Sequence, residues 1–372
     1  MSCPNPDVCG SCSWSHIPYE KQLKQKLSDI NGSLAIKKLD LQCDTILPSP
    51  KTDHYRNRMD FVIDFEGRVG MREKGKWWRV IDNHACFLAD EKIEKLFADI
   101  RSWTQSAGLS FFDRKAHTGL LRYAVIRSTS TGETLINIIT SVPEDTSAVH
   151  QALEKLNDLA QPTTLIWTTN ATISDVSFGE TEQVITGPGY LTEVVNGISY
   201  CISPQAFFQT NLFAAPLLQE AVVDLVDRDA KTVLDLYCGS GFFSLPLATK
   251  VDSVTGIELN ESAIEDAKRN AELNNLTNTR FFSAKTESLD LTQYPADTII
   301  VDPPRSGMHD DALASLIETK AKQIIYISCN YKNLARELVQ LTQHYEVSNL
   351  LAIDMFPHTP HVEVVCDLQR KA

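Results

Sequence analysis

The chain of 372 residues lacks both a run of about 18 apolar residues, the length that a membrane-spanning helix needs, and a signal peptide. These absences predict a cytoplasmic protein without membrane contact, whose nine cysteines serve as metal ligands or nucleophiles rather than in disulfides. Positive charge is also scarce, because 35 Lys and Arg stand against 48 Asp and Glu, a net charge of −13. That balance argues against nonspecific coating of nucleic acid, but a local basic surface on an acidic protein can still bind it.

Three cysteines, Cys3, Cys9 and Cys12, lie within ten residues of one another in a C-x5-C-x2-C spacing among Pro and Gly. Their thiolates can converge on one metal centre, and Cys86 is the best candidate for a fourth ligand. Four thiolates suit either a [4Fe-4S] cluster or tetrahedral zinc. We favour the cluster because paired C-x2-C knuckles are the commoner zinc pattern. Unligated cysteines are the alternative, which this clustering argues against.

The most basic part of the chain, residues 56–79, interleaves charged and aromatic side chains: Arg56, Arg58, Arg72, Lys76, Trp77 and Trp78 are among them. This pattern is typical of a nucleic-acid-binding surface and equally of a solvated hairpin. A short amphipathic helix is predicted at Tyr19–Leu27. Up to residue 202, strands and helices mix without a cofactor fingerprint, which predicts an α+β domain with an antiparallel sheet.

From Ser203 onward, strands alternate with helices, as in an α/β domain with a parallel sheet. One predicted strand, 231–236, opens onto Tyr237-Cys238-Gly239-Ser240-Gly241, where two glycines let the backbone turn tightly beneath a cofactor. The next strand ends in Glu258, whose carboxylate can accept both hydroxyls of a ribose. The glycines are too few for a phosphate cradle, so S-adenosylmethionine fits better than NAD. An ordinary glycine turn is the alternative.

Two further predicted strands end in polar clusters. The strand 297–301 ends in Asp302-Pro303-Pro304-Arg305, and the buried strand 324–327 ends in Ser328-Cys329-Asn330. Ligands of open α/β sheets bind beyond the carboxyl ends of such strands, so Cys329 is expected where chemistry takes place. A buried structural cysteine is the alternative.

A carboxylate also opens the last strand. Glu363 precedes the apolar residues 364–366, a poor position for a charged group without a task. It is therefore a candidate general base. His358 and His361, in the preceding loop, are weaker candidates.

Together these motifs resemble the RNA 5-methyluridine methyltransferases, and especially the iron–sulfur branch that acts on 23S ribosomal RNA. The resemblance covers nearly the whole chain and rests on the N-terminal cysteines, Arg56-Asn57, Cys86, Phe207-Phe208-Gln209, Asp235 to Gly239, Asp302 to Arg305, Ser328 to Asn330 and Asp354 to Thr359. Many members begin with a small oligonucleotide-binding-type barrel, for which there is no room before Cys3. Its absence resembles the shorter ribosomal-RNA subgroup.

The resemblance implies a Rossmann-like class I S-adenosylmethionine-dependent methyltransferase domain over residues 203–372. An α+β central RNA-binding domain would occupy residues 17–202, and an iron–sulfur loop, completed by Cys86, residues 1–16. The family also implies roles for individual residues: Cys329 as nucleophile, Glu363 as base, Gln209, Tyr237, Glu258 and Asp302 around the cofactor, and Cys3, Cys9, Cys12 and Cys86 on the [4Fe-4S] cluster.

Chemistry explains why such an enzyme needs both a thiol and a base. Uracil C5 is a poor nucleophile until a thiolate adds to C6 and turns C5 into an enolate-type carbanion. After methyl transfer, a base must remove the proton on C5 before the thiolate can leave. The target base must also be reachable, in a loop or extruded from the RNA.

The leading hypothesis is therefore C5 methylation of a uridine in 23S rRNA. The equivalent tRNA enzyme is the alternative within the same class, and a noncatalytic RNA-binding factor with a cofactor pocket is an alternative from another. A small-molecule or exocyclic-amine methyltransferase would need no thiol, and its strand-four motif usually ends in an aromatic residue rather than Arg305. No DNA partner is expected.

Overall fold

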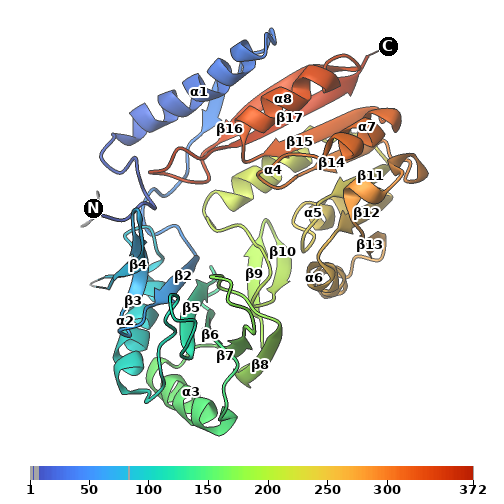
Figure 1. The fold of residues 1–372 in the computed structure, drawn as a ribbon. Coiled ribbons are helices and arrows are strands. Elements are labelled where there is room, and N and C mark those ends of the chain that lie inside the picture. Colours follow the sequence, from blue (N-terminus) through green and yellow to red (C-terminus); the bar gives the residue numbers. More distant parts are fainter. Residues whose placement is uncertain (1–2, 4–7, 83, 372) are drawn as a thin grey trace.

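The computed structural model describes residues 3, 8–82 and 84–371, which form two large sheets with helices on their faces (Figure 1). The C-terminal sheet has eight strands in the order β1-β16-β17-β15-β14-β11-β12-β13. In chain order these are β1 (Thr45–Leu47), β11 (Thr232–Leu236), β12 (Ser253–Glu258), β13 (Thr279–Ser283), β14 (Thr298–Val301), β15 (Gln323–Ser328), β16 (Tyr345–Ile353) and β17 (Glu363–Arg370).

The C-terminal sheet is covered on both faces. Strands β11 to β15 run parallel, and β17 is antiparallel to its neighbours β15 and β16. Apolar cores fill both sides, one beneath α4 (Ala215–Leu225), α5 (Ser244–Ala248) and α6 (Glu261–Leu273), the other beneath α1 (Tyr19–Ile36), α7 (Asp310–Glu318) and α8 (Tyr331–Leu341). Because both faces of β15 are buried, its sequence is a continuous apolar run, as predicted. The predicted α/β, Rossmann-like arrangement is present.

The second sheet has seven strands in the order β4-β3-β2-β5-β6-β7-β8. These are β2 (Arg58–Ile63), β3 (Val69–Glu73), β4 (Lys76–Ile81), β5 (Leu121–Ser128), β6 (Thr134–Thr140), β7 (Thr164–Thr169) and β8 (Thr181–Thr186). Helices α2 (Glu91–Ser106) and α3 (Thr146–Ala160) share one apolar core with one face of this sheet. The predicted antiparallel sheet is present except at one pairing, where the prediction was wrong: β6 and β7 pair in parallel, with α3 as the crossover between them.

A hairpin joins the two sheets, formed by β9 (Leu191–Val195) and β10 (Ile198–Ile202). Asn196 and Gly197 at its turn both have positive φ, which matches the Asn-Gly preference of such turns. Among the described residues, no helix is long and apolar enough to cross a membrane.

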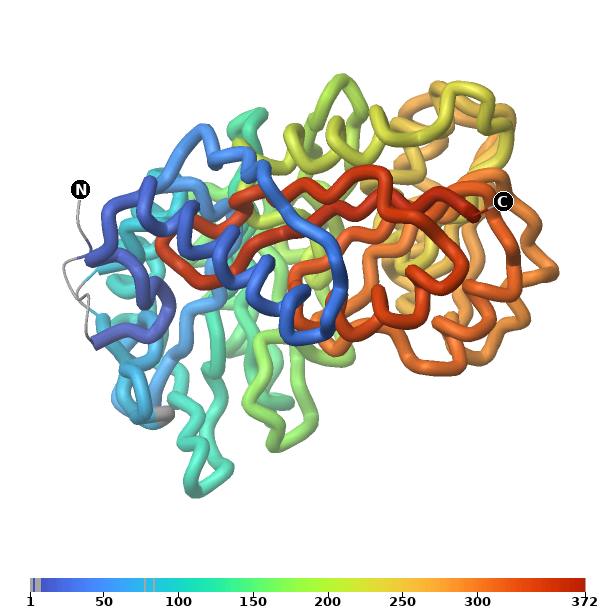
Figure 2. The backbone as a smooth tube through the Cα atoms, turned by 90° about the horizontal axis from the view of Figure 1, so that it is seen from above, coloured from blue at the N-terminus to red at the C-terminus, as the bar shows by residue number. Residues whose placement is uncertain are grey.

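The N-terminal segment departs from the predicted division of the chain. Strand β1 pairs in parallel with β16, and α1 contacts α8, so residues 19–47 belong to the C-terminal sheet rather than to the central domain. Figure 2 shows α1 lying along the strands β16 and β17. The helix is also longer than the predicted Tyr19–Leu27, because its second half buries Ile30 and Leu34 in the C-terminal core.

The loop between β16 and β17 is held by contacts from four separate segments. Lys26 Nζ on α1 donates to Asp354 Oδ1 at 2.6 Å, and both side chains are fully buried. Tyr55 Oη donates to the Pro357 carbonyl at 3.0 Å, and the Asn211 amide donates to the Met355 carbonyl at 3.0 Å. The backbone N–H of Trp14 reaches the His358 carbonyl at 3.0 Å. This loop, residues 354–362, leads directly into Glu363.

Replacing one partner of the buried pair should destabilise the protein strongly. We expect Lys26→Ala to lower the free energy of unfolding by about 3–5 kcal/mol, because it leaves the Asp354 carboxylate buried without its counter-charge. Urea denaturation measures the effect. The exposed Lys24 on the same helix provides the control, and Lys24→Ala should change stability by less than about 0.5 kcal/mol. The double variant Lys26→Met/Asp354→Leu should recover most of the loss, and an unchanged Lys26→Ala variant would contradict this role.

Candidate active site and cysteine cluster

Cys329 and Glu363 lie on neighbouring strands at the same edge of the C-terminal sheet. Cys329 follows the last residue of β15, and Glu363 is the first residue of β17. Ser328 pairs with Val364 in the antiparallel ladder, so the next positions outward on the two strands are Cys329 and Glu363. The thiol and the carboxylate, 34 positions apart in the sequence, are thereby brought side by side.

The pKa of the Cys329 thiol is raised to about 11, chiefly by burial and then by the nearby carboxylates of Glu363 and Asp302. Arg305 acts in the opposite direction, through its charge and a hydrogen bond to the Cys329 side chain. A guanidinium beside the sulfur stabilises the thiolate, which is the nucleophilic form. Arg305 therefore counteracts the effect of the two acids.

Glu363 is only 6% exposed, and burial raises the pKa of its carboxyl to about 7, with Arg305 again opposing the shift. A group with a pKa near neutrality both accepts and releases protons readily at physiological pH. The environment of Glu363 therefore suits a general base.

Both histidines considered as alternative bases lie in the loop that precedes Glu363. The His358 ring contacts Phe87 with ring centroids 5.3 Å apart, and its Nδ1 lies 3.1 Å from the amide nitrogen of Gln22. These contacts give His358 a structural role. The pKa of His361 is lowered by burial and then by the charge of Arg305, the residue that also acts on Cys329 and Glu363.

Two predicted cofactor residues occupy the tips of adjacent strands. Tyr237 follows β11 with a φ of 63°, and Glu258 ends β12. One Glu258 carboxylate oxygen accepts from the Gly239 N–H at 3.3 Å, and the other accepts from the Asn260 N–H at 2.9 Å. Gly239 has a positive φ of 52°, and the space that a side chain would occupy at this position is open. The predicted turn is thus bonded to Glu258 at the carboxyl edge of the sheet, where ligands of open α/β sheets bind.

Several carboxyl groups lie between Glu258 and the neighbouring residues Cys329 and Glu363. Burial, Glu363 and Asp235 raise the pKa of Asp302 well above its ordinary value. Burial and Glu258 raise the pKa of Asp235 to about 7. Such a series favours a cationic ligand, and S-adenosylmethionine carries a sulfonium and an ammonium group. The donor set therefore fits this cofactor. Gln209 is buried on the segment after β10, and its contact with the cofactor stays a prediction.

Asp235 was not singled out in the sequence as a site residue. It lies within β11, fully buried, where its carboxylate accepts a hydrogen bond from the Ser244 hydroxyl and its second oxygen lacks a partner. An acid inside an otherwise apolar strand was the available signal.

The four predicted cluster ligands converge around one small cavity. Cys3, Cys9, Cys12 and Cys86 line it, and all four are free thiols. Burial raises the pKa of Cys12 to about 12, and Cys3 and Cys86 raise it as well. Among the described residues, no group of three or more His, Cys, Asp or Glu side chains is arranged to hold a metal ion. The structure confirms the gathering of the cysteines and leaves the iron–sulfur cluster a prediction.

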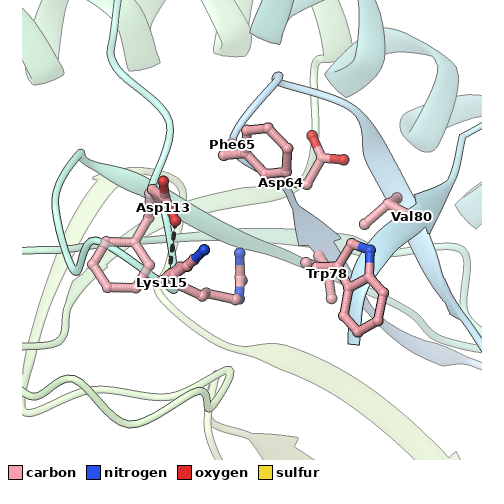
Figure 3. A pocket seen from close by; sticks show the side chains of 9 residues that line it. Asp64, Phe65, Trp78, Val80, Asp113 and Lys115 are labelled. Atoms are coloured by element: carbon pink, nitrogen blue, oxygen red, sulfur yellow. Dashed lines mark hydrogen bonds between the residues drawn. The ribbon is translucent and has the colours of Figure 1, made fainter. Parts of the chain in front are cut away.

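The basic window is largely compensated within the protein. Arg58 Nε contacts Asp60 at 2.9 Å, Arg72 pairs with Asp175, and Lys76 pairs with Glu73. Arg56 differs, because its Nε is buried without a partner in a groove of about 430 Å³ between β2 and the segment 205–210. A second cavity of about 520 Å³, lined by Phe65, Trp78 and Lys115, contains none of the predicted site residues (Figure 3).

Known proteins resemble this chain in both sequence and structure. The sequence model of the tRNA (uracil-5-)-methyltransferase family matches residues 18–371. A tRNA (uracil(54)-C(5))-methyltransferase of Pyrococcus horikoshii is 36% identical over 364 residues, which cover 97% of this chain and 83% of the relative. A protein of Caldanaerobacter subterraneus subsp. tengcongensis, described as an uncharacterized RNA methyltransferase, is 36% identical over 388 residues, covering 99% of this chain and 84% of the relative.

A solved structure extends the comparison to three dimensions. The Pyrococcus abyssi tRNA (uracil-54, C5)-methyltransferase in complex with S-adenosyl-L-homocysteine superposes with a TM-score of 0.84 at 32% sequence identity. The match covers 97% of this chain and 86% of the other. It confirms the predicted Rossmann-like methyltransferase architecture and enzyme class. The chain therefore belongs to the tRNA (uracil-5-)-methyltransferase family.

Proposed function

We propose that this protein methylates C5 of a uridine in tRNA, in the cytoplasm, with S-adenosylmethionine as methyl donor. The observation that carries the reaction type is the pairing of Cys329 with Glu363 beside Arg305 at the carboxyl edge of the sheet. The RNA class is supported by relatives named as tRNA enzymes that align with nearly the whole chain. They favour tRNA over 23S rRNA, the leading expectation from the sequence.

The reaction begins at Cys329. Its sulfur adds as the thiolate to C6 of the uracil, and Arg305 stabilises the negative charge before addition. The electron pair released to C5 then attacks the electrophilic methyl group that S-adenosylmethionine supplies when bound. The addition makes a carbon nucleophile that the free base lacks.

Glu363 completes the reaction. Its carboxylate takes the proton from C5, the C5–C6 double bond re-forms, and the bond between Cys329 and C6 breaks. With its pKa near 7, Glu363 is substantially ionised at neutral pH and is a stronger base than an exposed glutamate. Thiol and carboxylate therefore act on the two adjacent carbons, C6 and C5.

We also propose that the four converging cysteines hold a [4Fe-4S] cluster. Each iron of such a cluster takes one thiolate, so its ligands surround a body larger than a single ion. The proposal is supported by the four free cysteines that line one cavity. The backbone N–H of Trp14, two residues after Cys12, bonds to the loop that leads to Glu363. The cluster would thus fix that end of the loop.

Trapping of RNA tests both the mechanism and the substrate. Glu363→Gln should still add to C6 and transfer the methyl group but fail to remove the C5 proton. The variant should accumulate as a covalent complex with unmodified tRNA transcript, seen as a shifted band on a denaturing gel, only when S-adenosylmethionine is present. The matched double variant Cys329→Ala/Glu363→Gln should trap nothing.

Three outcomes would contradict parts of this proposal. Trapping of 23S rRNA fragments but not of tRNA would overturn the substrate and leave the mechanism standing. Normal turnover by Glu363→Gln would remove Glu363 as the base and make His361 the next candidate. Trapping by the double variant would remove Cys329 as the nucleophile.

A buried base should also cost stability in a pH-dependent way. Because the folded-state pKa of Glu363 lies near 7, above its ordinary value of 4.5, the folded protein binds more protons between these pH values. The contribution of Glu363 to the free energy of unfolding is therefore fully present below pH 4.5 and is lost as the pH rises through 7. Glu363→Gln should gain stability relative to wild type by up to about 3 kcal/mol between pH 5 and pH 8. Urea denaturation at both pH values measures this. The exposed Glu346→Gln is the control, and a constant difference would refute the shifted pKa.

Metal analysis tests the cluster. Protein purified without oxygen should contain about four iron and four sulfide per chain. Cys86→Ser should lower the iron content, whereas Cys43→Ser, a buried free cysteine outside the group, should leave it unchanged. Stoichiometric zinc without iron would contradict the assignment.

A further inference from the structure

The face of the seven-stranded sheet opposite α2 and α3 carries a series of connected cavities. Helices α2 and α3 pack against Phe61 and Ile63, whereas Val62 and Val80 point to the other face and form a separate apolar group there. Three cavities of about 430, 380 and 520 Å³ follow one another across that second face. The first and second share Asp60 and Met71, and the second and third share Val62.

The charge along this series differs from that of the rest of the chain. Seven Lys or Arg and four Asp or Glu side chains line the three cavities, whereas the whole chain has 35 and 48. Arg58 pairs with Asp60, and Arg72 and Arg114 both pair with Asp175, so the net positive charge of the series comes from the other basic side chains. An acidic protein with a basic line of connected cavities has the charge distribution that a polyanion requires. The first cavity contains Phe207 and Phe208, which directly precede Gln209. The residues at one end of the series are therefore next in sequence to Gln209, a predicted cofactor residue.

The far end of the series has the chemistry of a nucleobase site. Trp78 on β4 is 50% exposed, and Phe65, just after β2, is 47% exposed, yet both line the same cavity (Figure 3). Exposed aromatic side chains in a cavity of this size offer stacking surfaces to a planar base. Lys115 is exposed at its rim, where an ammonium group can meet the adjoining phosphate.

Two carboxylates also line this cavity, and both are already engaged. Asp64 accepts from the backbone N–H groups of Glu66 and Arg68, and its second oxygen pairs with Arg68 Nε at 2.7 Å. Asp113 accepts from the backbone N–H groups of Lys115 and Ala116. These contacts compensate the two negative charges, and the aromatic side chains remain accessible.

We propose that the cavity between Phe65 and Trp78 binds an unpaired base of the RNA substrate, at a distance from the uridine that is methylated. Lys115 binds the phosphate next to that base. RNA follows the cavities on the face of the sheet opposite α2 and α3 and reaches Cys329 and Glu363 beyond Phe207. The inference rests on the proposed RNA substrate and adds to it a second point of base recognition.

Substitutions at the two aromatic residues test the site. Trp78→Ala and Phe65→Ala should each raise the Kd for unmodified tRNA transcript by roughly 5- to 100-fold, as loss of one stacked base does. Trp78→Phe should keep most of the affinity because it keeps a stacking ring. The rate at saturating RNA should stay unchanged in all three variants, since none of these residues touches the reacting atoms. Phe282→Ala, at a 45% exposed position on β13, is the matched control and should bind like wild type.

A charge variant and a spectroscopic signal complete the test. Lys115→Gln should reduce the slope of log Kd against log salt by about one, whereas Lys155→Gln, on the helix-covered face, should leave the slope unchanged. RNA binding should quench a component of the tryptophan fluorescence that is absent in Trp78→Phe.

The results separate this inference from the proposed function. Wild-type affinity and wild-type quenching in the Trp78 and Phe65 variants, together with normal tRNA methylation, would overturn the base site and leave the proposed function intact. Failure of the wild-type protein to bind or methylate tRNA would instead overturn the proposed function.

Discussion

The buried contact between Lys26 and Asp354 is the constraint on which the arrangement of the site depends. It fixes helix α1 to the start of the loop that ends at Glu363, and neither charge reaches solvent. A buried ion pair adds little net stability over an apolar pair of the same shape, but it tolerates few alternative positions because each charge must stay with the other. Together with the contacts of Tyr55 and Asn211, it limits where β17 can begin. The position of the base relative to Cys329 follows from that limit.

The reactive edge illustrates the cost of placing acids in a low-polarity environment. Burial raises the pKa of Asp235, Asp302 and Glu363, and a neighbouring acid raises the pKa of Asp235 and of Asp302 further. An apolar sheet edge would be more stable without them. The same environment makes Glu363 a usable base near neutral pH and leaves the edge suited to a positively charged methyl donor. Stability and chemistry therefore place opposite demands on these positions.

Local sequence patterns singled out the candidate catalytic residues, because each pattern is set by its own strand. The apolar run 324–327 predicted a buried strand that ends at Cys329, and an acid before an apolar run singled out Glu363. Contacts between segments far apart in the sequence could not be predicted from such local patterns. Nothing near Lys26 in the sequence shows that it pairs with Asp354, 328 positions away. The length of α1 and the pairing of β1 were missed for the same reason. The parallel pairing of β6 and β7 likewise depends on a crossover rather than on the strands themselves.

The position of β1 has a consequence for the order in which the chain assembles. Thr45 pairs with Leu351, so one edge of the C-terminal sheet joins residues about 300 positions apart. The seven-stranded sheet lies between these residues in the sequence, and its strands pair with one another rather than with strands of the C-terminal sheet. During synthesis from the N-terminus, that sheet can form before β16, the partner of β1, has been synthesised. Closure of the methyl-transfer domain is therefore a late event with a large loop-closure entropy, and a chain that ends before β16 leaves its N-terminal strand as an unpaired edge.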